Sequence, residues 1–270
     1  MAWEAAVRLS FFFGVFGAVA MWELAAPRRA LTTPKAARWL SNLGLVALNT
    51  LLLRLIFPAA AVGLAFTVQD RAWGLLNNVD LPFWIETLGA VVFLDMAIYF
   101  QHVLFHAAPS LWRLHRMHHA DLDYDVTTGA RFHPIEIILS MLIKFGVVTA
   151  IGASPGSVLI FEVLLNATAM FNHGNIRIPE RVDAVLRLFV VTPDMHRVHH
   201  SVEPREANSN FGFNLPWWDR LFGTYLPQPA KGHLGMVIGI KEFRGPRDNR
   251  LDRMLIQPFV SPGSGYAINR

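Results

Sequence analysis

The chain has 270 residues, of which 53% are hydrophobic and only 16% are charged. Soluble domains carry about 25% charged residues, so this deficit indicates a membrane protein. The absence of cysteine excludes disulfides, thiolate metal sites and thiol nucleophiles. A net charge of +4 would suit nucleic acid or an anionic membrane surface, and the scattering of basic residues among long apolar runs favours the membrane.

Five apolar segments reach or approach the roughly 20 residues that cross a bilayer. In chain order they are Ala5–Ala26, Leu43–Phe66, Phe83–His106, Pro134–Ala153 and Pro155–Asn172. The first is expected to be a retained span, because Glu4 accompanies Arg8 at its start and basic residues follow it, which is the wrong charge order for a signal peptide. The sequence therefore predicts an all-α bundle with about four to five transmembrane spans.

Basic residues near the spans predict the orientation of the bundle. The connection after the first span holds Arg28, Arg29, Lys35 and Arg38 and no acidic residue, which places it in the cytoplasm. The third span then ends inside, the fourth and fifth form a hairpin that turns outside at residues 152–157, and the chain from His173 onward is cytoplasmic. All histidine-rich segments thus fall at one membrane face.

Three regions follow from this reading of the chain. Residues 1–92 hold N-terminal spans, residues 93–225 hold the remaining spans and a histidine-rich cytoplasmic helical cap, and residues 226–270 form an irregular cytoplasmic tail rich in Pro and Gly. Arg181–Val191 is short and amphipathic, as in an interfacial helix. His233, in the tail, is expected to be a solvated surface residue.

Eight of the 11 histidines occur at spacings that suit metal ligands. They form one His-x-x-x-His pair and two His-x-x-His-His triplets: His102 and His106; His115, His118 and His119; His196, His199 and His200. Residues three or four apart share a helix face, so each set can reach one site. Single histidines at two other span ends, His133 and His173, are predicted to join it.

Other interpretations of these histidines remain open at this point. Imidazoles at helix ends can simply meet water or headgroups, and a cluster could act as a proton relay or pH switch. Packed imidazoles would repel one another once protonated, whereas a metal ion removes that problem. We therefore predict a metal site with two ions, because eight to ten imidazoles exceed what one ion uses; imidazole alone suits Zn, Fe, Cu or Ni.

Several polar residues are candidates to orient the ligands. Asp95 and Tyr99 lie seven and three residues before His102 on the same helical face, and Asp95 is expected to accept the free N–H of a ligand imidazole. The further candidates are Asn172, Asn175, Asp194 and Glu136. No catalytic residue is predicted beyond the metal ligands.

Two charges inside the predicted hairpin are expected to be structural. Lys144 lies eleven residues after His133, and Glu162 lies eleven residues before His173. Both should therefore lie roughly 16 Å from the cytoplasmic end of their helices. Because unpaired charges are costly in hydrocarbon, we predict a Lys144–Glu162 ion pair.

The histidine pattern resembles the fatty acid hydroxylase/sterol desaturase superfamily of integral-membrane di-iron enzymes. The resemblance extends through "DMAIYFQHVLFH", "LWRLHRMHHADLDYDVTTGARFHPIE", "FNHGNI", "TPDMHRVHH" and "NSNFGFNLPWWDRLFGTY", which together cover about residues 95–225. It implies that the eight motif histidines are iron ligands, that His173 is an additional ligand, and that His133 is a ligand or the partner of one. Many members have Arg after the first histidine of the pair, where this chain has Val103.

The resemblance implies a membrane-bound non-haem di-iron oxidoreductase that uses O2 to hydroxylate or desaturate a lipid C–H bond. Zinc could replace iron in a purified protein. The chain holds no "HPGG" haem element and no Gly-rich dinucleotide fingerprint, so a separate electron donor, a reductase, ferredoxin or cytochrome, is expected. No nucleic acid partner is expected.

Two other functional classes compete with a lipid hydroxylase. The first is a non-catalytic metal-binding or lipid-binding membrane protein, which the intact ligand series disfavours. The second is a zinc-dependent membrane hydrolase, which needs a carboxylate base beside an open zinc position, and only Glu136 is a candidate for that role.

Overall fold

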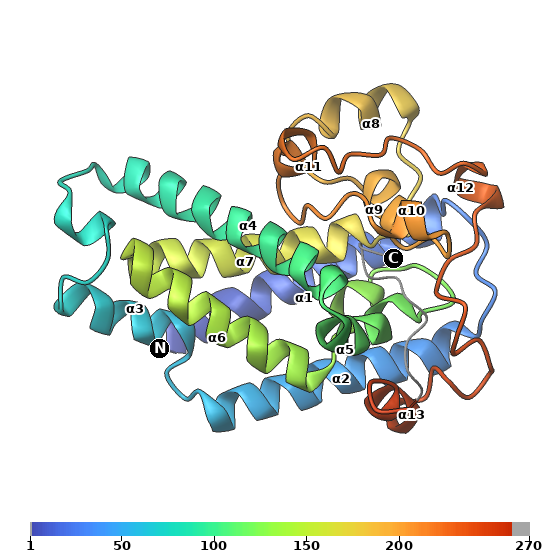
Figure 1. The fold of residues 1–270 in the computed structure, drawn as a ribbon, viewed down its shortest axis with the longest axis horizontal. Coiled ribbons are helices and arrows are strands. Elements are labelled where there is room, and N and C mark those ends of the chain that lie inside the picture. Colours follow the sequence, from blue (N-terminus) through green and yellow to red (C-terminus); the bar gives the residue numbers. More distant parts are fainter. Residues whose placement is uncertain (1, 261–270) are drawn as a thin grey trace.

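The computed structural model describes residues 2–260, and within them the fold is all-helical, as predicted. The only β-pairing in this range is two isolated bridges, Pro27 with Ile176 and Ser201 with Ile238. Long helices run along the molecule, and short helices gather at one end as a cap (Figure 1). The bundle helices are α1 (Ala2–Ala25), α2 (Lys35–Ile56), α3 (Ala60–Asp70), α4 (Phe83–Ala107), α6 (Pro134–Ile151) and α7 (Pro155–Asn172).

The cap is made of shorter elements. They are α5 (Pro109–His119), α8 (Glu180–Leu186), α9 (Pro193–His199), α10 (Pro204–Ala207), α11 (Trp217–Leu221), α12 (Gly232–Gly235) and α13 (Leu251–Ile256). Two 3₁₀ helices, η1 (Leu76–Asn78) and η2 (Thr128–Ala130), lie in connections. Of the segment Arg181–Val191, predicted as an interfacial helix, residues 181–186 are helical as part of α8. The helices in the described part of the predicted irregular tail are α12 and α13.

Four helical stretches in residues 2–260 are long and apolar enough to cross a membrane: Trp3–Ala25, Lys35–Asp70, Phe83–Ala107 and Pro134–Ile151. This indicates a multi-pass membrane protein. The predicted second span is divided, because α2 ends at Ile56 and α3 begins at Ala60; Pro58, between them, lacks a backbone N–H. The predicted fifth span, α7, is a helix packed against α1 and α4, but its polar side chains keep it outside these four.

The hairpin between α6 and α7 turns at the predicted residues because of its turn chemistry. Gly152 ends α6 in the left-handed conformation, with φ of 73°, which glycine adopts without strain. Ser154 caps α7 by accepting a hydrogen bond from Ser157 N, and Pro155 occupies the first helical position. Glu86 of α4 accepts hydrogen bonds from the hydroxyls of both Ser154 and Ser157, which fixes this turn to α4.

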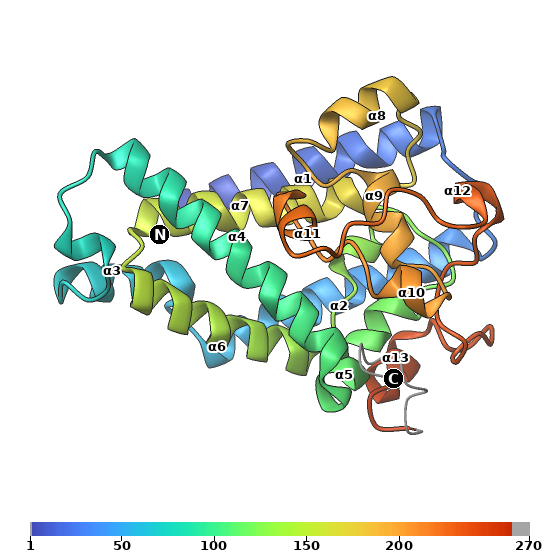
Figure 2. The ribbon, with the colours of Figure 1, turned by 45° about the horizontal axis from the view of Figure 1, so that its top comes forward.

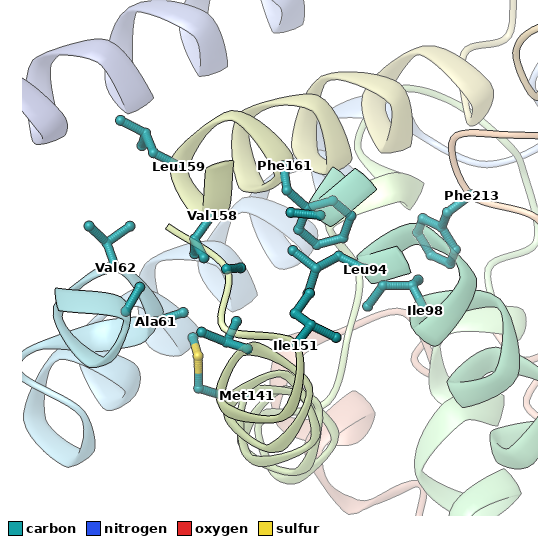
Figure 3. Close-up of a cluster of buried hydrophobic side chains, with 14 of the residues drawn as sticks. Ala61, Val62, Leu94, Ile98, Met141, Ile151, Val158, Leu159, Phe161 and Phe213 are labelled. Carbon is teal, nitrogen blue, oxygen red and sulfur yellow. The ribbon is translucent and has the colours of Figure 1, made fainter. Parts of the chain in front are cut away.

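The main apolar core lies between α3, α4, α6 and α7. Leu94 and Ile98 of α4, Met141 and Ile151 of α6 and Phe161 of α7 meet there (Figure 3). Large apolar side chains also lie exposed along the outside of the bundle, including Phe11, Phe13 and Leu24 of α1. The bundle is therefore apolar in its core and also on its outer surface, as expected of helices surrounded by lipid.

The ion pair predicted from the equal depth of Lys144 and Glu162 in the membrane joins α6 to α7. Lys144 Nζ lies 2.6 Å from Glu162 Oε1. Sequence reasoning missed a third member, because Arg8 Nη2 of α1 lies 2.6 Å from Glu162 Oε2 and 3.0 Å from Glu4 Oε1. Three helices are thus linked by charges inside the bundle.

A buried ion network connects the start of α2 to the loop between α5 and α6. The Arg38 guanidinium bonds to Asp121 at 2.8 Å and to Asp125 at 2.7 Å, and Arg131 lies 4.0 Å from Asp121. All four side chains are buried. Burial alone would raise the pKa of Asp121, but Arg38 and Arg131 outweigh it and hold that pKa below its usual value.

The end of the described chain closes over α5 and α2, where α13 lies beside them (Figure 2). The guanidinium of Arg113 donates to Pro258 O at 2.7 Å, and that of Arg116 donates to Val260 O at 2.9 Å. The tail is therefore part of the packed cap.

Replacing Arg38 by leucine tests the buried network. Arg38→Leu leaves Asp121 and Asp125 without their main cationic partner in the interior, and removal of one member of a buried pair costs about 3–5 kcal/mol. We expect a large drop in the melting temperature of the purified protein. Arg253→Leu, at a surface pair that is more than half exposed, is the matched control and should change stability little. Equal melting temperatures of the two variants would show that the network is not needed for stability.

Candidate metal centre

Nine buried histidines form two groups at the capped end of the bundle. They come from the end of α4, from α5, from the residue after α7, and from α9 with the residue after it. The five-histidine group is His102, His106, His115, His119 and His199; the four-histidine group is His118, His173, His196 and His200. Within each group the candidate ligand atoms all lie within 4.8 Å of one another.

Helical spacing explains how the histidines divide between the groups. Histidines four apart stay together, as His102 with His106, His115 with His119, and His196 with His200. The middle member of each triplet, His118 or His199, goes to the other group. Since neighbouring residues of a helix point about 100° apart, each triplet contributes to both groups, which lie side by side. The ring centroids of His119 and His200 are 4.6 Å apart.

The Nε2 atoms of several imidazoles face one another. His102 Nε2 lies 3.1 Å from His115 Nε2, and His106 Nε2 lies 3.1 Å from His119 Nε2. In the four-histidine group, His173 Nε2 lies 3.2 Å from the Nε2 atoms of both His118 and His196.

The other ring nitrogen, Nδ1, is held by an oxygen atom in many of these imidazoles. The Nδ1 atoms of His102, His118, His173 and His199 contact the carbonyl oxygens of Phe211, Arg131, Ala169 and Ser209, at 2.8, 3.2, 2.7 and 2.8 Å. A carbonyl only accepts hydrogen bonds, so each Nδ1 carries the proton and donates it. In the neutral ring this leaves the lone pair on Nε2.

These contacts fit a metal ion bound by Nε2. The Nε2 lone pairs of His118 and His173 face each other at 3.2 Å, which is repulsive unless a cation lies between them. His199 Nε2 and both nitrogens of His200 are buried without a hydrogen-bond partner among residues 2–260. Unpaired buried nitrogens are costly, and metal coordination would satisfy His199 Nε2 and one of the two nitrogens of His200.

The surroundings also keep the imidazoles in their ligand form. Burial, and then the nearness of other imidazoles, lowers the pKa of His118 and His119 on α5 well below the ordinary value. The same causes lower the pKa of His196, His199 and His200. These rings are therefore neutral at physiological pH, with lone pairs free for a metal.

Glu136, at the start of α6, takes the place that was expected of Asp95. Its Oε1 lies 2.6 Å from His115 Nδ1, and the carboxylate is buried. It was among the weaker candidates in the sequence. A carboxylate on Nδ1 fixes the imidazole orientation and raises the basicity of Nε2.

Asp95 does not contact an imidazole, contrary to the prediction. Its carboxylate accepts from the backbone N–H groups of Asn214 and Leu215 and from Trp218 Nε1. Among the described residues, no hydrogen bond joins either histidine group to the four other predicted orienting side chains. Those are Tyr99, whose hydroxyl meets Thr224; Asn172, which donates to Phe213 O; Asn175, which pairs with the backbone of Arg29; and Asp194, which pairs with Arg28 and Arg197.

Asp219 orients a ligand indirectly, and sequence reasoning missed this role. Its two carboxylate oxygens accept from Phe211 N at 2.7 Å and Gly212 N at 2.9 Å, while Thr224 Oγ1 donates to it at 2.7 Å. This holds the Phe211 carbonyl against His102 Nδ1. The "WDRLFGTY" stretch therefore supports the centre through the backbone.

Two histidines lie elsewhere than expected. His133 joins neither group; it is the N-cap of α6, where Nδ1 accepts from Ile135 N and Nε2 donates to Leu255 O. The following Pro134 was a signal for this capping position. His233 is buried, not solvated, with Nε2 3.5 Å from Asp194.

A cavity of about 790 Å³ runs from the bundle interior to the histidines. The end of the cavity nearest the histidines is lined by His102, His115, Glu136 and Phe213. No member of the four-histidine group lines the cavity. The opposite end is lined by residues of α1 and by the α2–α3 connection. The five-histidine group is thus the one that faces the cavity.

Comparison with known proteins identifies a family that matches this chain. The family model described as fatty acid hydroxylase matches residues 87–224, which is 138 of the 270 residues and includes all nine clustered histidines. No solved structure matches the chain.

Curated relatives agree with the family match. Alkylglycerol monooxygenase of Xenopus tropicalis is 26% identical over 213 residues, covering 75% of this chain and 45% of the relative. Ornithine lipid hydroxylase OlsE of Rhizobium tropici is 29% identical over 189 residues, covering 66% and 56%. Alkylglycerol monooxygenase of Danio rerio is 28% identical over 177 residues, covering 63% and 38%. The chain spans about half the length of these relatives. It belongs to the fatty acid hydroxylase family.

Proposed function

We propose that this chain is a membrane-bound, non-haem, O2-dependent hydroxylase of lipids with two iron ions. The facing Nε2 lone pairs of His118 and His173 carry the proposal, because a cation bound by both nitrogens would remove the repulsion between them. The five-histidine group would hold one ion and the four-histidine group the other. Imidazole accepts several metals, so zinc can occupy the same positions in a purified protein.

The comparisons support iron and oxygen over other metal chemistry. The relatives are named as a monooxygenase and a lipid hydroxylase, which favours hydroxylation over desaturation. When bound, two iron ions supply the activation of dioxygen and the cleavage of an unactivated C–H bond. A separate reductase, ferredoxin or cytochrome would deliver two electrons for each turnover.

The residues of this chain position the substrate and keep the ligands neutral. A lipid in the cavity would place its reacting carbon between His102, His115 and Phe213, beside the five-histidine group. Glu136 holds the Nδ1 proton of His115, and the Phe211 carbonyl holds that of His102. The four-histidine group, away from the cavity wall, lies behind them.

The histidine centre is proposed to lie at the cytoplasmic face. Arg28, Arg29, Lys35 and Arg38 follow α1 on the capped side, and a positive connection of this kind favours the cytoplasm. Of the competing classes, a zinc hydrolase is disfavoured because its only candidate base, Glu136, is bonded to a ligand imidazole.

Metal analysis with one ligand removed from each group tests the centre. Protein from iron-supplemented cells should contain about two iron ions per chain, one for each group. The His118→Ala/His199→Ala double variant should lose most of that iron, while His233→Ala, which removes a buried imidazole outside both groups, should retain it. Iron content that is unaffected by the double variant would refute the assignment.

The reaction is tested by lipid analysis. With O2 and an electron donor, the iron-loaded protein should convert a membrane lipid to a product with one added oxygen atom, and the double variant should not. Full iron occupancy without any oxygenated lipid would favour a non-catalytic binding protein, and zinc-supported hydrolysis would favour the hydrolase.

Glu136 should affect the five-histidine group selectively. Glu136→Leu leaves His115 Nδ1 without its acceptor, and loss of such a partner typically lowers metal affinity about 10–100-fold. Glu136→Gln keeps an acceptor oxygen and should lose less. Chelator competition measures both affinities; equal losses, or none in the leucine variant, would mean that the contact does not support the metal.

Gly129 should matter for the other group. A Cβ at this position would lie 2.5 Å from Ala169 O, the acceptor of the His173 Nδ1 proton, and 3.2 Å from Nδ1 itself. We expect Gly129→Ala to lower metal occupancy in the four-histidine group, whereas Gly146→Ala, in open space on α6, should not. Unchanged occupancy in both variants would show that the loop tolerates the shift.

A further inference from the structure

The cavity is not apolar along its whole length. Glu4, Arg8, Lys144 and Glu162 line it and form the charged cluster: Arg8 bonds to both glutamates, and Lys144 bonds to Glu162. Glu162 is buried, and Lys144 is nearly so. Charges inside a membrane bundle are costly and by default mark a path for a ligand.

The charged cluster lies at a defined distance from the histidines. Lys144 is eight residues after Glu136 on α6, and Glu136 bonds to His115. At 1.5 Å per residue the separation along the helix is about 12 Å. Since Lys144, Glu136 and His115 all line the same cavity, a single lipid can reach both ends.

Charge balance decides which chemical group the cluster suits. The two cations and two anions of the cluster balance, so the cluster itself has no net charge with which to attract an ion. Arg54 also lines the cavity, but it is exposed and forms no ion pair among residues 2–260. It does have unused donors: among the described residues Lys144 Nζ makes one hydrogen bond of a possible three, and Arg8 Nη1 makes none. Free N–H groups without excess charge match an uncharged oxygen acceptor.

A second polar group on the same wall points to a polar ligand. Asn49 is 8% exposed and lines the cavity, and its Oδ1 has no hydrogen-bond partner among residues 2–260, while its Nδ2 donates to Phe132 O. A cavity built only for a hydrocarbon chain would leave Asn49 and the free N–H groups unsatisfied. A lipid hydroxyl could donate to Asn49 Oδ1, and any lipid oxygen could accept from the free N–H groups.

We propose that the charged cluster is a specificity site for an uncharged oxygen, a hydroxyl, ether or carbonyl, carried by the lipid about 12 Å from the carbon presented to the five-histidine group. This rests on the proposed function of the cavity as the lipid site. The ligand class is therefore a lipid with a polar group inside its length, as opposed to a plain alkyl chain.

Binding of two matched probes tests the site without turnover. Octadecane and its mid-chain alcohol differ by one oxygen atom, and displacement of a spin-labelled hydrocarbon from the detergent-purified full chain measures their affinities. A hydrogen bond to a charged donor predicts roughly tenfold tighter binding of the hydroxylated probe. Equal affinity of the wild-type protein for both probes would overturn the proposal.

Substitutions in the cluster identify the donor. Lys144→Met keeps the length of the side chain and leaves Glu162 paired with Arg8. The ratio of the affinities for the hydroxylated and the plain probe should therefore fall toward one, while the affinity for the plain probe is kept. Lys231→Met, at an exposed pair with Glu203, is the matched control and should retain the preference. Preference retained in both Lys144→Met and Arg8→Met would overturn the proposal. If Lys144→Met does not fold, Arg8→Met and Lys144→Arg, which keeps the donors, decide the outcome.

Product formation separates this proposal from the function on which it rests. Oxygenated product formed equally well from both probes, with no difference in affinity, would remove the cluster as a specificity site and leave the hydroxylase. Cluster-dependent binding without any product would support the site and refute the hydroxylase.

Discussion

The cap is built around one electrostatic constraint: buried, neutral imidazoles whose lone pairs point at one another. His118 and His173 show it most simply, because each gives its Nδ1 proton to a carbonyl and each must then present its Nε2 lone pair to the other. Protonation would relieve the contact in water, but burial disfavours the charged ring. A cation bound by both Nε2 atoms would remove this repulsion, and the rest of the fold holds the rings where such a cation would bind.

Keeping the rings in place depends on backbone carbonyls, which are in turn fixed by buried charges. Asp219 holds the backbone at Phe211, and the Phe211 carbonyl holds His102. On the other side, Arg131 contributes its carbonyl to His118 and its guanidinium to the network with Asp121 and Arg38. Arg38 belongs to α2, outside the residues that match the family model, so the centre is supported by chain segments that contain no histidine motif.

Eight of the nine clustered histidines were predictable from spacing, because residues at i and i+4 share a helix face and can serve the same site, whereas His173 is a single histidine. The division into two groups also follows from helix geometry, although it becomes clear only when the segments are seen together. The orienting groups were not predictable, because a carbonyl has no side-chain signature in the sequence. Asp95 illustrates the difficulty: it has the correct helical phase beside His102, but the backbone N–H groups of Asn214 and Leu215 bond to both of its oxygens.

The sequence predicts the helices of the bundle, and the differences between the predicted and the observed helices have local causes. Pro58 divides the second span, and Pro134 makes His133 a helix cap in place of a ligand. The Lys144–Glu162 pair was predictable because two opposite charges at equal depth in the membrane are stabilised by pairing with each other. The pairing of Arg8 with Glu162 was not predictable, because nothing in the sequence of α1 indicates which helix it packs against.

Two kinds of polarity share the interior of the bundle, and their separation has a consequence for selectivity. At the capped end of the cavity lie buried imidazoles that are grouped closely enough to hold metal ions. About 12 Å away along α6, paired charges offer hydrogen bonds. A flexible chain anchored at one polar point and confined by helices has few carbons that can reach the histidines. Position along the lipid is then set by distance from the oxygen that binds the cluster, and not by the chemistry of the C–H bond itself. The rigid spacing along α6 between Glu136 and Lys144 would thus act as the ruler that selects the carbon to be oxidised.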